Sequence, residues 1–350
     1  MQWYDRIRQV KFLLLAMAVV ITVGSLVVSH FLVQDLAEGE RRNMEVWAAV
    51  RPTSSRRYLT DARIHFIELD FSSSERLQKQ MAGHSYDYIV HAAGVTKCLH
   101  TADFERVNTE GTRHLAEAIQ TLKMPIKRFV YLSSLSVFGA IKEQMPYEEI
   151  TENDHPKPNT AYGKSKLKAE ECLDSAEYGF PYIVSRPTGV YGPRERDYFL
   201  MAKSIQNHLD FAVGYRRQDI TFVYVKDVVQ AVFLALDHGK SGRKYFLSDG
   251  QVYQSSTFSN LIHNEIGRPW WLRITAPVWL LRIVTFFGEQ WGHLTGRMTA
   301  LNNDKYNILK QRNWRCDIEP AVDELGFHPQ YTLEQGVKET VAWYKDNHWL

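Results

Sequence analysis

The amino-acid sequence predicts an α/β fold, in which a doubly wound parallel sheet precedes a smaller, mainly helical C-terminal lobe. From residue 45 onward, short apolar runs alternate with helical stretches, the pattern of a parallel sheet with helices on both faces. The run Tyr88–Val90 shows no polar alternation, as expected for a strand buried on both faces. Beyond Gly192 the alternation loosens, which predicts the second lobe.

The expected elements follow one another in a regular order. Strands are expected at Val46–Val50, Ile64–Glu68, Tyr88–His91, Phe129–Leu132 and Tyr182–Ser185, with helices such as Thr101–Leu122 and Ala161–Tyr178 between them. In the second lobe, strands at Thr221–Val225 and Lys244–Leu247 flank a helix at Asp227–Asp237 and return to the main sheet. We therefore divide the chain into residues 1–44, 45–192 and 193–350.

Composition excludes several classes of protein. Hydrophobic residues make up 45% and charged residues 23% of the chain, which rules out wholesale disorder and a fibrous repeat. A net charge of +2 leaves no electrostatic footprint for nucleic acid. The three cysteines are few and far apart, so we expect no disulfide framework, no zinc site and a reducing, cytoplasmic location.

Residues 1–44 form an atypical apolar N-terminus. From Phe12 to Val33, 17 of 22 residues are apolar, and basic residues precede the run. Taken alone, residues 12–33 have the length and apolar composition of a membrane anchor. Alternatively, residues 12–42 supply the opening strand and helix of the sheet domain. The two interpretations exclude each other, and we favour the strand and helix.

Tyr162 and Lys166 are the most informative pair of residues. Their spacing of four places both side chains on one helix face, and a lysine ammonium near a phenol lowers the pKa of that phenol. Such a tyrosine can exchange a proton with a carbonyl or an alcohol. Ser134 ends a predicted strand 28 residues earlier, at the sheet edge where ligands bind. Tyr306 and Lys310 are also four residues apart, but no comparable strand and serine precede them.

These residues belong to a wider set of motifs. The set comprises Ala92-Ala93-Gly94, Asn108, Ser133-Ser134, Tyr162 with Lys166, and the segment from Arg186 to Pro193. It resembles the extended short-chain dehydrogenase/reductase family, also described as the NAD-dependent epimerase/dehydratase group, from about Glu45 to Asp237. That group includes dihydroflavonol-reductase-like and 3β-hydroxysteroid-dehydrogenase-like enzymes, and the chain resembles one or the other. The resemblance implies a Rossmann-like sheet and a substrate-binding second lobe.

The resemblance also implies roles for individual residues. Tyr162 would donate or accept the proton, Lys166 would hold the nicotinamide ribose and tune Tyr162, and Ser134 would orient the substrate oxygen. The cofactor would be bound by Arg51, Asp70, Phe71, Ala92, Ala93, Gly94, Asn108 and Pro187. The segment after the second strand holds Arg51, Arg56 and Arg57 but no acid, which favours NADP over NAD.

The N-terminus departs from the family pattern. Residues 1–44 contain only Gly24 and Gly39, so the Gly-x-x-Gly-x-x-Gly loop that approaches the cofactor phosphates is missing. Aligning Ser29–Val33 with the first family helix puts its glycines at Thr22, Ser25 and Val28. A cofactor-less binding protein therefore stays an alternative, as does a reading-frame change upstream of about Ser29.

The substrate class is less specified than the fold. Leu135-Ser136 replaces the acidic pair of the family's dehydratases, and Ile220 replaces an arginine common in its sugar-nucleotide epimerases. Residues 269–291 are rich in large apolar side chains. Trp279, Ile283 and Phe286 fall on one helical face, which we expect to pack on the core. The alternatives are an apolar substrate pocket and a membrane-touching surface.

We therefore expect NAD(P)-dependent interconversion of an alcohol and a ketone by Ser134, Tyr162 and Lys166. A sugar-nucleotide epimerase with the same triad is the alternative enzyme. The expected partner is a small, apolar molecule. Membrane contact through residues 12–33 or 269–291, and a homodimer, are compatible with the sequence.

Overall fold

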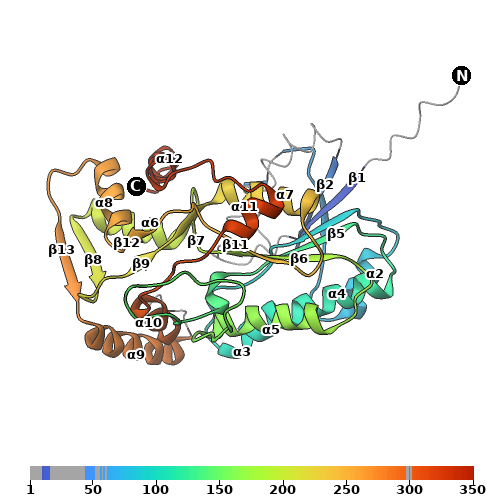
Figure 1. Cartoon of the computed structure of the whole chain (residues 1–350), viewed down its shortest axis with the longest axis horizontal. Helices are drawn as coiled ribbons and strands as arrows, with labels where there is room; N and C mark the ends of the chain where they lie inside the picture. The colour runs from blue at the N-terminus through green and yellow to red at the C-terminus, as the bar shows by residue number, and fades with distance from the viewer. Residues whose placement is uncertain are drawn as a thin grey trace, which may run out of the picture.

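A seven-stranded parallel sheet forms the centre of the molecule (Figure 1). The computed structural model describes residues 10–15 (backbone only), 44–51, 56, 58–59, 61–296, 299 and 302–350. In spatial order the strands are β11 (Lys244–Leu247), β6 (Tyr182–Pro187), β5 (Arg128–Leu132), β4 (Tyr88–His91), β1 (Val10–Leu15), β2 (Met44–Val50) and β3 (His65–Glu68). The order reverses between β1 and β4, where α/β folds bind their ligands.

Strand β1 lies in the middle of this sheet. It pairs with β2 on one side, from Val10 opposite Met44, and with β4 on the other, from Phe12 opposite Tyr88. The expected opening strand is therefore present, and it uses the first part of the apolar run. A membrane anchor beginning at Phe12 does not agree with this placement. The expected first helix and the positions Thr22, Ser25 and Val28 lie outside the described residues.

Helices cover both faces of the sheet, as the sequence predicts. On one face lie α2 (Ser74–Met81), α4 (Gly111–Thr121) and α5 (Ala161–Ser175), whose buried Leu77, Leu115 and Leu173 share one hydrophobic cluster. On the other face lie α7 (Val225–His238), α11 (Glu319–Leu325) and α12 (Leu333–Asp346), which belong to a second cluster. Figure 1 shows the two layers on opposite sides of the strands.

The helix expected at Thr101–Leu122 is interrupted. The structure has α3 (Thr101–Phe104), a π-helical turn (Glu105–Glu110) and then α4. The wider turn directs Asn108 and Thr109 toward α5, where both form hydrogen bonds with Ser165. Single π-helical turns often occur at functional sites.

The second lobe contains more strand than expected. Three two-stranded sheets join β7 (Gly189–Tyr191) to β10 (Phe222–Tyr224), β9 (Asp219–Ile220) to β12 (Tyr253–Gln254), and β8 (Leu209–Val213) to β13 (Leu272–Ala276). Its helices include α6 (Arg196–Gln206), α8 (Thr257–Ile266), α9 (Val278–Thr295) and α10 (Asn303–Lys310). Of the two strands expected to return to the main sheet, only β11 does so, because β10 pairs with β7.

The expectation that Trp279, Ile283 and Phe286 pack on the core is wrong. All three lie on α9 as predicted, but they are exposed to solvent. The opposite side of α9, which carries the buried Leu281 and Thr285, is the side that packs, and α10 contacts α9. Among the helices of the described segments, none has the length and apolar character needed to cross a membrane.

Candidate functional site

Ser134 and Tyr162 meet where β5 ends and α5 begins. Ser134 caps a short 3-10 helix, Leu135–Val137, by accepting a hydrogen bond from the Ser136 amide at 3.2 Å. Thr160 caps α5 by accepting from the Gly163 amide at 2.9 Å. These caps fix the backbone on both sides, and Ser134 is near enough to Tyr162 to act on the pKa of that phenol, which it lowers.

Lys166 lies one helical turn further along α5. Its Nζ donates to the Leu132 carbonyl oxygen at 2.8 Å and lies 4.6 Å from the centre of the Tyr131 ring. Burial lowers the pKa of Lys166 to about 7, although the Glu170 carboxylate acts in the opposite direction. Its ammonium therefore loses a proton near neutral pH, in contrast to an exposed lysine.

The pKa of Tyr162 moves opposite to the sequence expectation. Burial raises it to about 12, and the hydrogen bond with Ser134 offsets only part of that rise. Lys166 does not lower this pKa: burial disfavours the charge of the lysine, and its Nζ is directed to the Leu132 carbonyl. Tyr162 is therefore a protonated phenol at neutral pH.

Gly94 and Asn108 fasten the loop after β4 to the same helix. The Asn108 amide exchanges two hydrogen bonds with the Val95 backbone, at 2.8 and 3.0 Å, and donates to the Ser165 hydroxyl at 2.9 Å. A Cβ atom at Gly94 would lie 3.0 Å from Asn108 Oδ1 and 3.3 Å from Lys166 Nζ. Only glycine fits there without displacing these groups. Ala92 and Ala93 precede it and are buried.

The remaining predicted residues lie along the carboxyl edge of the same sheet. Arg51 follows β2, Asp70 and Phe71 follow β3, and Pro187 ends β6. Burial, together with the charge of Arg106, lowers the pKa of Arg51. The Asp70 carboxylate is held by Ser72 and Arg76, and these hydrogen bonds lower its pKa to about 2.

Two of these residues have neighbours that the sequence did not indicate. Arg56, expected to face a 2′-phosphate, forms an ion pair with Glu68 at 3.3 Å and lies over the Phe66 ring. Phe71 stacks on His91 at 6.0 Å, and burial lowers the pKa of His91 to about 3. Arg57 lies outside the described residues.

The second lobe contributes a carboxylate to the site. Asp304, in the first turn of α10, accepts hydrogen bonds from the backbone amides of Ala161 and Tyr162 at 3.0 and 3.2 Å. The positive end of the α5 dipole favours this negative charge. Asp304 thus fixes the backbone of Tyr162 directly. The sequence holds no signal for this contact, because the partners lie more than 140 residues apart.

A second ionic contact joins the lobes. Asp197, on α6, lies between Lys97, which follows β4, and Lys305 on α10. Although burial acts to raise it, the charges of Lys305 and Lys97 lower the pKa of Asp197. The sequence did not indicate a role for any of these three residues, because a single charged residue is typical of a protein surface.

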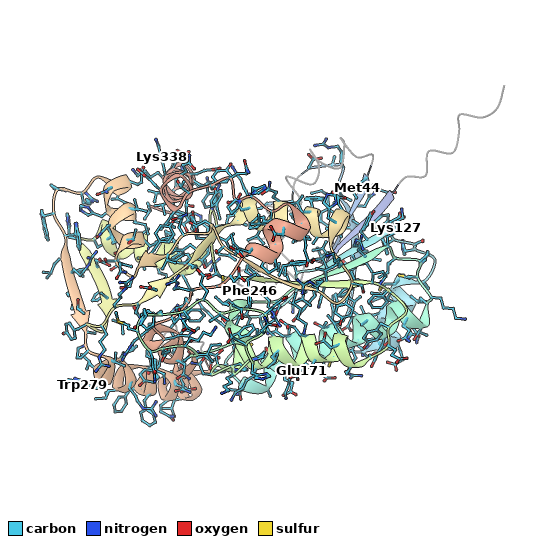
Figure 2. All side chains as sticks on the ribbon, viewed as in Figure 1. Met44, Lys127, Glu171, Phe246, Trp279 and Lys338 are labelled. Carbon is cyan, nitrogen blue, oxygen red and sulfur yellow. The ribbon has the colours of Figure 1, made fainter. Side chains whose placement is uncertain are left out.

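A buried ion pair lies behind α5. Glu170, one turn after Lys166, is fully buried and accepts from Arg186 Nε at 3.1 Å, from Arg186 Nη2 and from the Ser133 hydroxyl. The Arg186 guanidinium lies over the rings of Phe138 and Phe246, 5.0 and 5.6 Å from their centres. Figure 2 labels Phe246. This pair fixes the end of β6 against α5.

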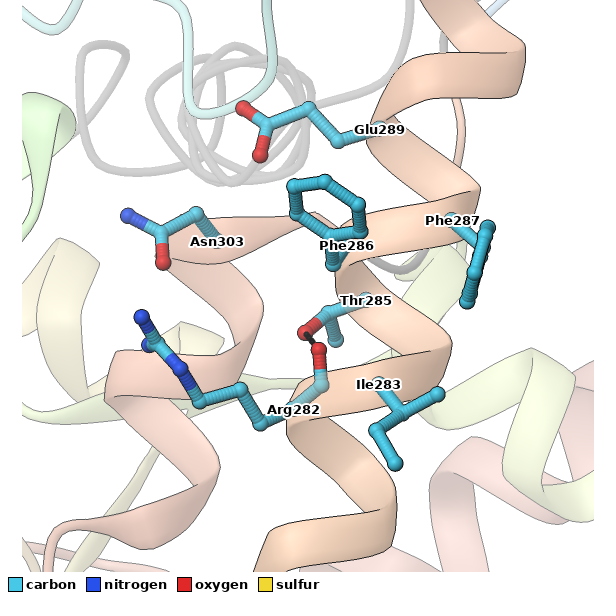
Figure 3. Close-up of a pocket in the computed structure, with 7 residues that line it drawn as sticks. All are labelled: Arg282, Ile283, Thr285, Phe286, Phe287, Glu289 and Asn303. Carbon is cyan, nitrogen blue, oxygen red and sulfur yellow. Dashed lines mark hydrogen bonds between the residues drawn. The ribbon is translucent and has the colours of Figure 1, made fainter.

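A pocket of about 220 Å³ lies between α9 and α10. Figure 3 shows Arg282, Phe286 and Asn303 facing one another in this pocket, which is also lined by Ile283, Thr285, Phe287 and Glu289. Ser134, Tyr162 and Lys166 are not among its lining residues. In the described part of the chain, no group of three or more His, Cys, Asp or Glu side chains is arranged to hold a metal ion.

Comparison with known proteins places this geometry in context. A UDP-glucose 4-epimerase from Vibrio cholerae is 27% identical over 245 residues, covering 68% of each chain. A dTDP-glucose 4,6-dehydratase from Streptomyces niveus is 27% identical over 295 residues, covering 81% of this chain and 76% of the relative. The crystal structure of the NAD-bound dTDP-glucose 4,6-dehydratase from Streptomyces venezuelae superposes with a TM-score of 0.76 at 20% identity, over 97% of this chain and 98% of that one.

The family model described as "NAD dependent epimerase/dehydratase family" matches residues 23–248. This match extends beyond the range of about 45 to 237 that the motifs indicate. With its sheet order, its strand-end site and this match, the chain belongs to the NAD-dependent epimerase/dehydratase family of extended short-chain dehydrogenases/reductases.

Proposed function

We propose that this protein interconverts a secondary alcohol and a ketone with a nicotinamide cofactor, using Tyr162 to move the proton. The observation that supports this best is the placement of Tyr162 beside Ser134 at the end of β5, with Lys166 one turn along α5. Two hydroxyls at the carboxyl edge of a parallel sheet can hold one substrate oxygen there.

The protonation state of Tyr162 favours the direction of reduction. With a pKa of about 12, the phenol is protonated at neutral pH and can donate to a carbonyl oxygen. In that step hydride adds to the carbonyl carbon, the Tyr162 proton adds to its oxygen, and an alcohol results. Ser134 orients the oxygen that receives the proton.

The residues near Tyr162 fit the nicotinamide end of such a cofactor. A Cβ at Gly94 would crowd Asn108 and Lys166, so a glycine at this position keeps the backbone open beside the lysine. When bound, a nicotinamide ring supplies or accepts the hydride. Lys166 and Asn108 would hold that end, and Arg51 would hold the adenosine end, where it favours a 2′-phosphate and hence NADP.

A sugar-nucleotide epimerase is the second candidate, because the Vibrio cholerae relative is a UDP-glucose 4-epimerase. In that reaction the same oxidation is followed by re-reduction from the opposite face, so the cofactor ends unchanged. Dehydration is less well supported, because the buried Leu135 follows Ser134 where the dehydratases carry an acidic pair.

The decisive experiment measures turnover of the purified chain with NADPH or NADH and a panel of ketones, followed by nicotinamide absorbance. In parallel, UDP-glucose is incubated with NAD and its epimer is quantified by proton NMR. We expect Tyr162→Phe to lower turnover by roughly 10²- to 10⁴-fold, because a general acid is lost. Cofactor affinity should stay within about twofold, since the ring is kept.

Tyr306→Phe is the matched control. Tyr306 and Lys310 stand four residues apart on α10, and the Lys310 Nζ lies 4.8 Å from the centre of the Tyr306 ring. This variant should keep full turnover. Unchanged turnover in Tyr162→Phe would contradict the proposed role.

A further inference from the structure

Large apolar side chains gather on the outer side of α9. They are Trp279, Leu280, Ile283, Val284, Phe286, Phe287, Trp291 and Leu294, which we call the apolar ridge. Most other exposed large apolar side chains of the described residues lie on the adjoining β8 and β13 or beside them. Full burial of one such side chain contributes about 1.5–3 kcal/mol, so a continuous exposed group of this size indicates an interaction surface.

The ridge projects from the body of the molecule. Figure 2 shows side chains of α9 extending outward from the edge of the structure, beginning at Trp279. In Figure 3, Ile283 and Phe287 point away from the side of α9 that faces α10. A helix that projects in this way can sink its apolar side into the outer layer of a bilayer.

The charge and aromatic content of this region suit a lipid surface. Residues 268–296 contain three arginines and one acidic residue, Glu289. Arg268 and Arg282 are exposed and would meet anionic headgroups. Trp270, Trp279 and Trp291 are at least 60% exposed, and tryptophan favours the level of the headgroups. Interfacial helices combine these features.

We propose that the apolar ridge docks the protein on a bilayer with anionic headgroups, with α9 lying in the plane of the interface. Ile283, Phe287 and Leu294 enter the acyl layer, while Arg268 and Arg282 remain among the headgroups. The docking surface is independent of the proposed redox function, and either can fail without the other.

The test is sedimentation of the full chain with vesicles of phosphatidylcholine and phosphatidylglycerol, compared with vesicles of phosphatidylcholine alone. We expect stronger binding to the anionic vesicles. The double variant Phe286→Ser/Phe287→Ser removes two side chains that are 57% and 65% exposed. It should weaken binding by at least about tenfold, because the buried apolar area is lost. Circular dichroism checks that both proteins are folded.

The matched control is Met145→Ser/Leu200→Ser, because these side chains are 63% and 51% exposed but lie outside the ridge. Its binding should equal that of the unmodified chain. Absence of vesicle binding would overturn the proposal, as would equal binding by the phenylalanine variant, which would assign the contact to another segment. A dimer in sedimentation equilibrium that only the phenylalanine variant dissociates, without vesicle binding, would assign the ridge to a second copy instead.

Discussion

At the scale of single residues, Glu170 is a fully buried carboxylate with two basic neighbours. It is fully buried, and the charges around it come from Arg186 and, at 3.5 Å, from Lys244. Replacing one member of a buried ion pair leaves the other uncompensated, which costs about 3–5 kcal/mol. We expect Glu170→Gln to lower the free energy of unfolding by that amount in urea denaturation.

Glu171 provides the control for this variant, because it is the next residue on α5 and is exposed. Glu171→Gln should change the free energy of unfolding by less than about 0.5 kcal/mol. Equal losses in the two variants would show that the ion pair with Arg186 adds nothing beyond an ordinary surface charge.

Arg51 tests the cofactor preference at the same scale. An acid at this strand end accepts a hydrogen bond from a ribose 2′-hydroxyl, whereas an arginine attracts a 2′-phosphate. Arg51→Asp should therefore raise the ratio of NADPH to NADH dissociation constants by about tenfold or more, measured by fluorescence titration. Arg63→Asp, on the exposed loop before β3, should leave that ratio unchanged. A constant ratio in both variants would remove Arg51 from the phosphate site.

At the scale of elements, the contact between α10 and the N-terminus of α5 is the most consequential. Asp304 accepts two backbone hydrogen bonds there, and loss of such a cap costs about 1 kcal/mol. We expect Asp304→Ala to lower the melting temperature by a few degrees and to reduce kcat more than it raises KM, because the Tyr162 backbone loses its support.

The neighbouring Asn303, exposed on the same helix turn, serves for comparison. Asn303→Ala should leave both the melting temperature and kcat close to those of the unmodified chain. If Asp304→Ala destabilised the protein without altering kcat, Asp304 would be a structural cap and not a positioning residue.

The sequence predicted best the helices and strands in which apolar residues follow a regular pattern. The run Tyr88–His91 became β4 without change, and α5 begins at the predicted Ala161. Strand β13 was missed, because a short apolar run does not distinguish strand from helix by periodicity alone. Periodicity also identified one face of α9 but not whether that face meets protein or solvent. The π-helical turn has no sequence signature and is stabilised by contacts between Asn108 and Ser165.

At the scale of the whole molecule, the catalytic candidates were predictable where they are close in sequence. Tyr162 and Lys166 share one helix, and Ser134 follows the preceding strand, so spacing and strand order sufficed. Asp304, Asp197 and Lys97 reach the same region from three distant segments. Only the packing of the second lobe on the first brings them together, and that packing depends on tertiary contacts that no local pattern encodes.

The Asp304 contact also bears on the speed of the catalytic cycle. Whenever α10 moves away from α5, a carboxylate must leave the positive end of a helix, so separation of the lobes is opposed by attraction between opposite charges. Salt screens such attraction. Because the Tyr162 backbone depends on this contact, turnover should fall as ionic strength rises, in the same direction as in Asp304→Ala.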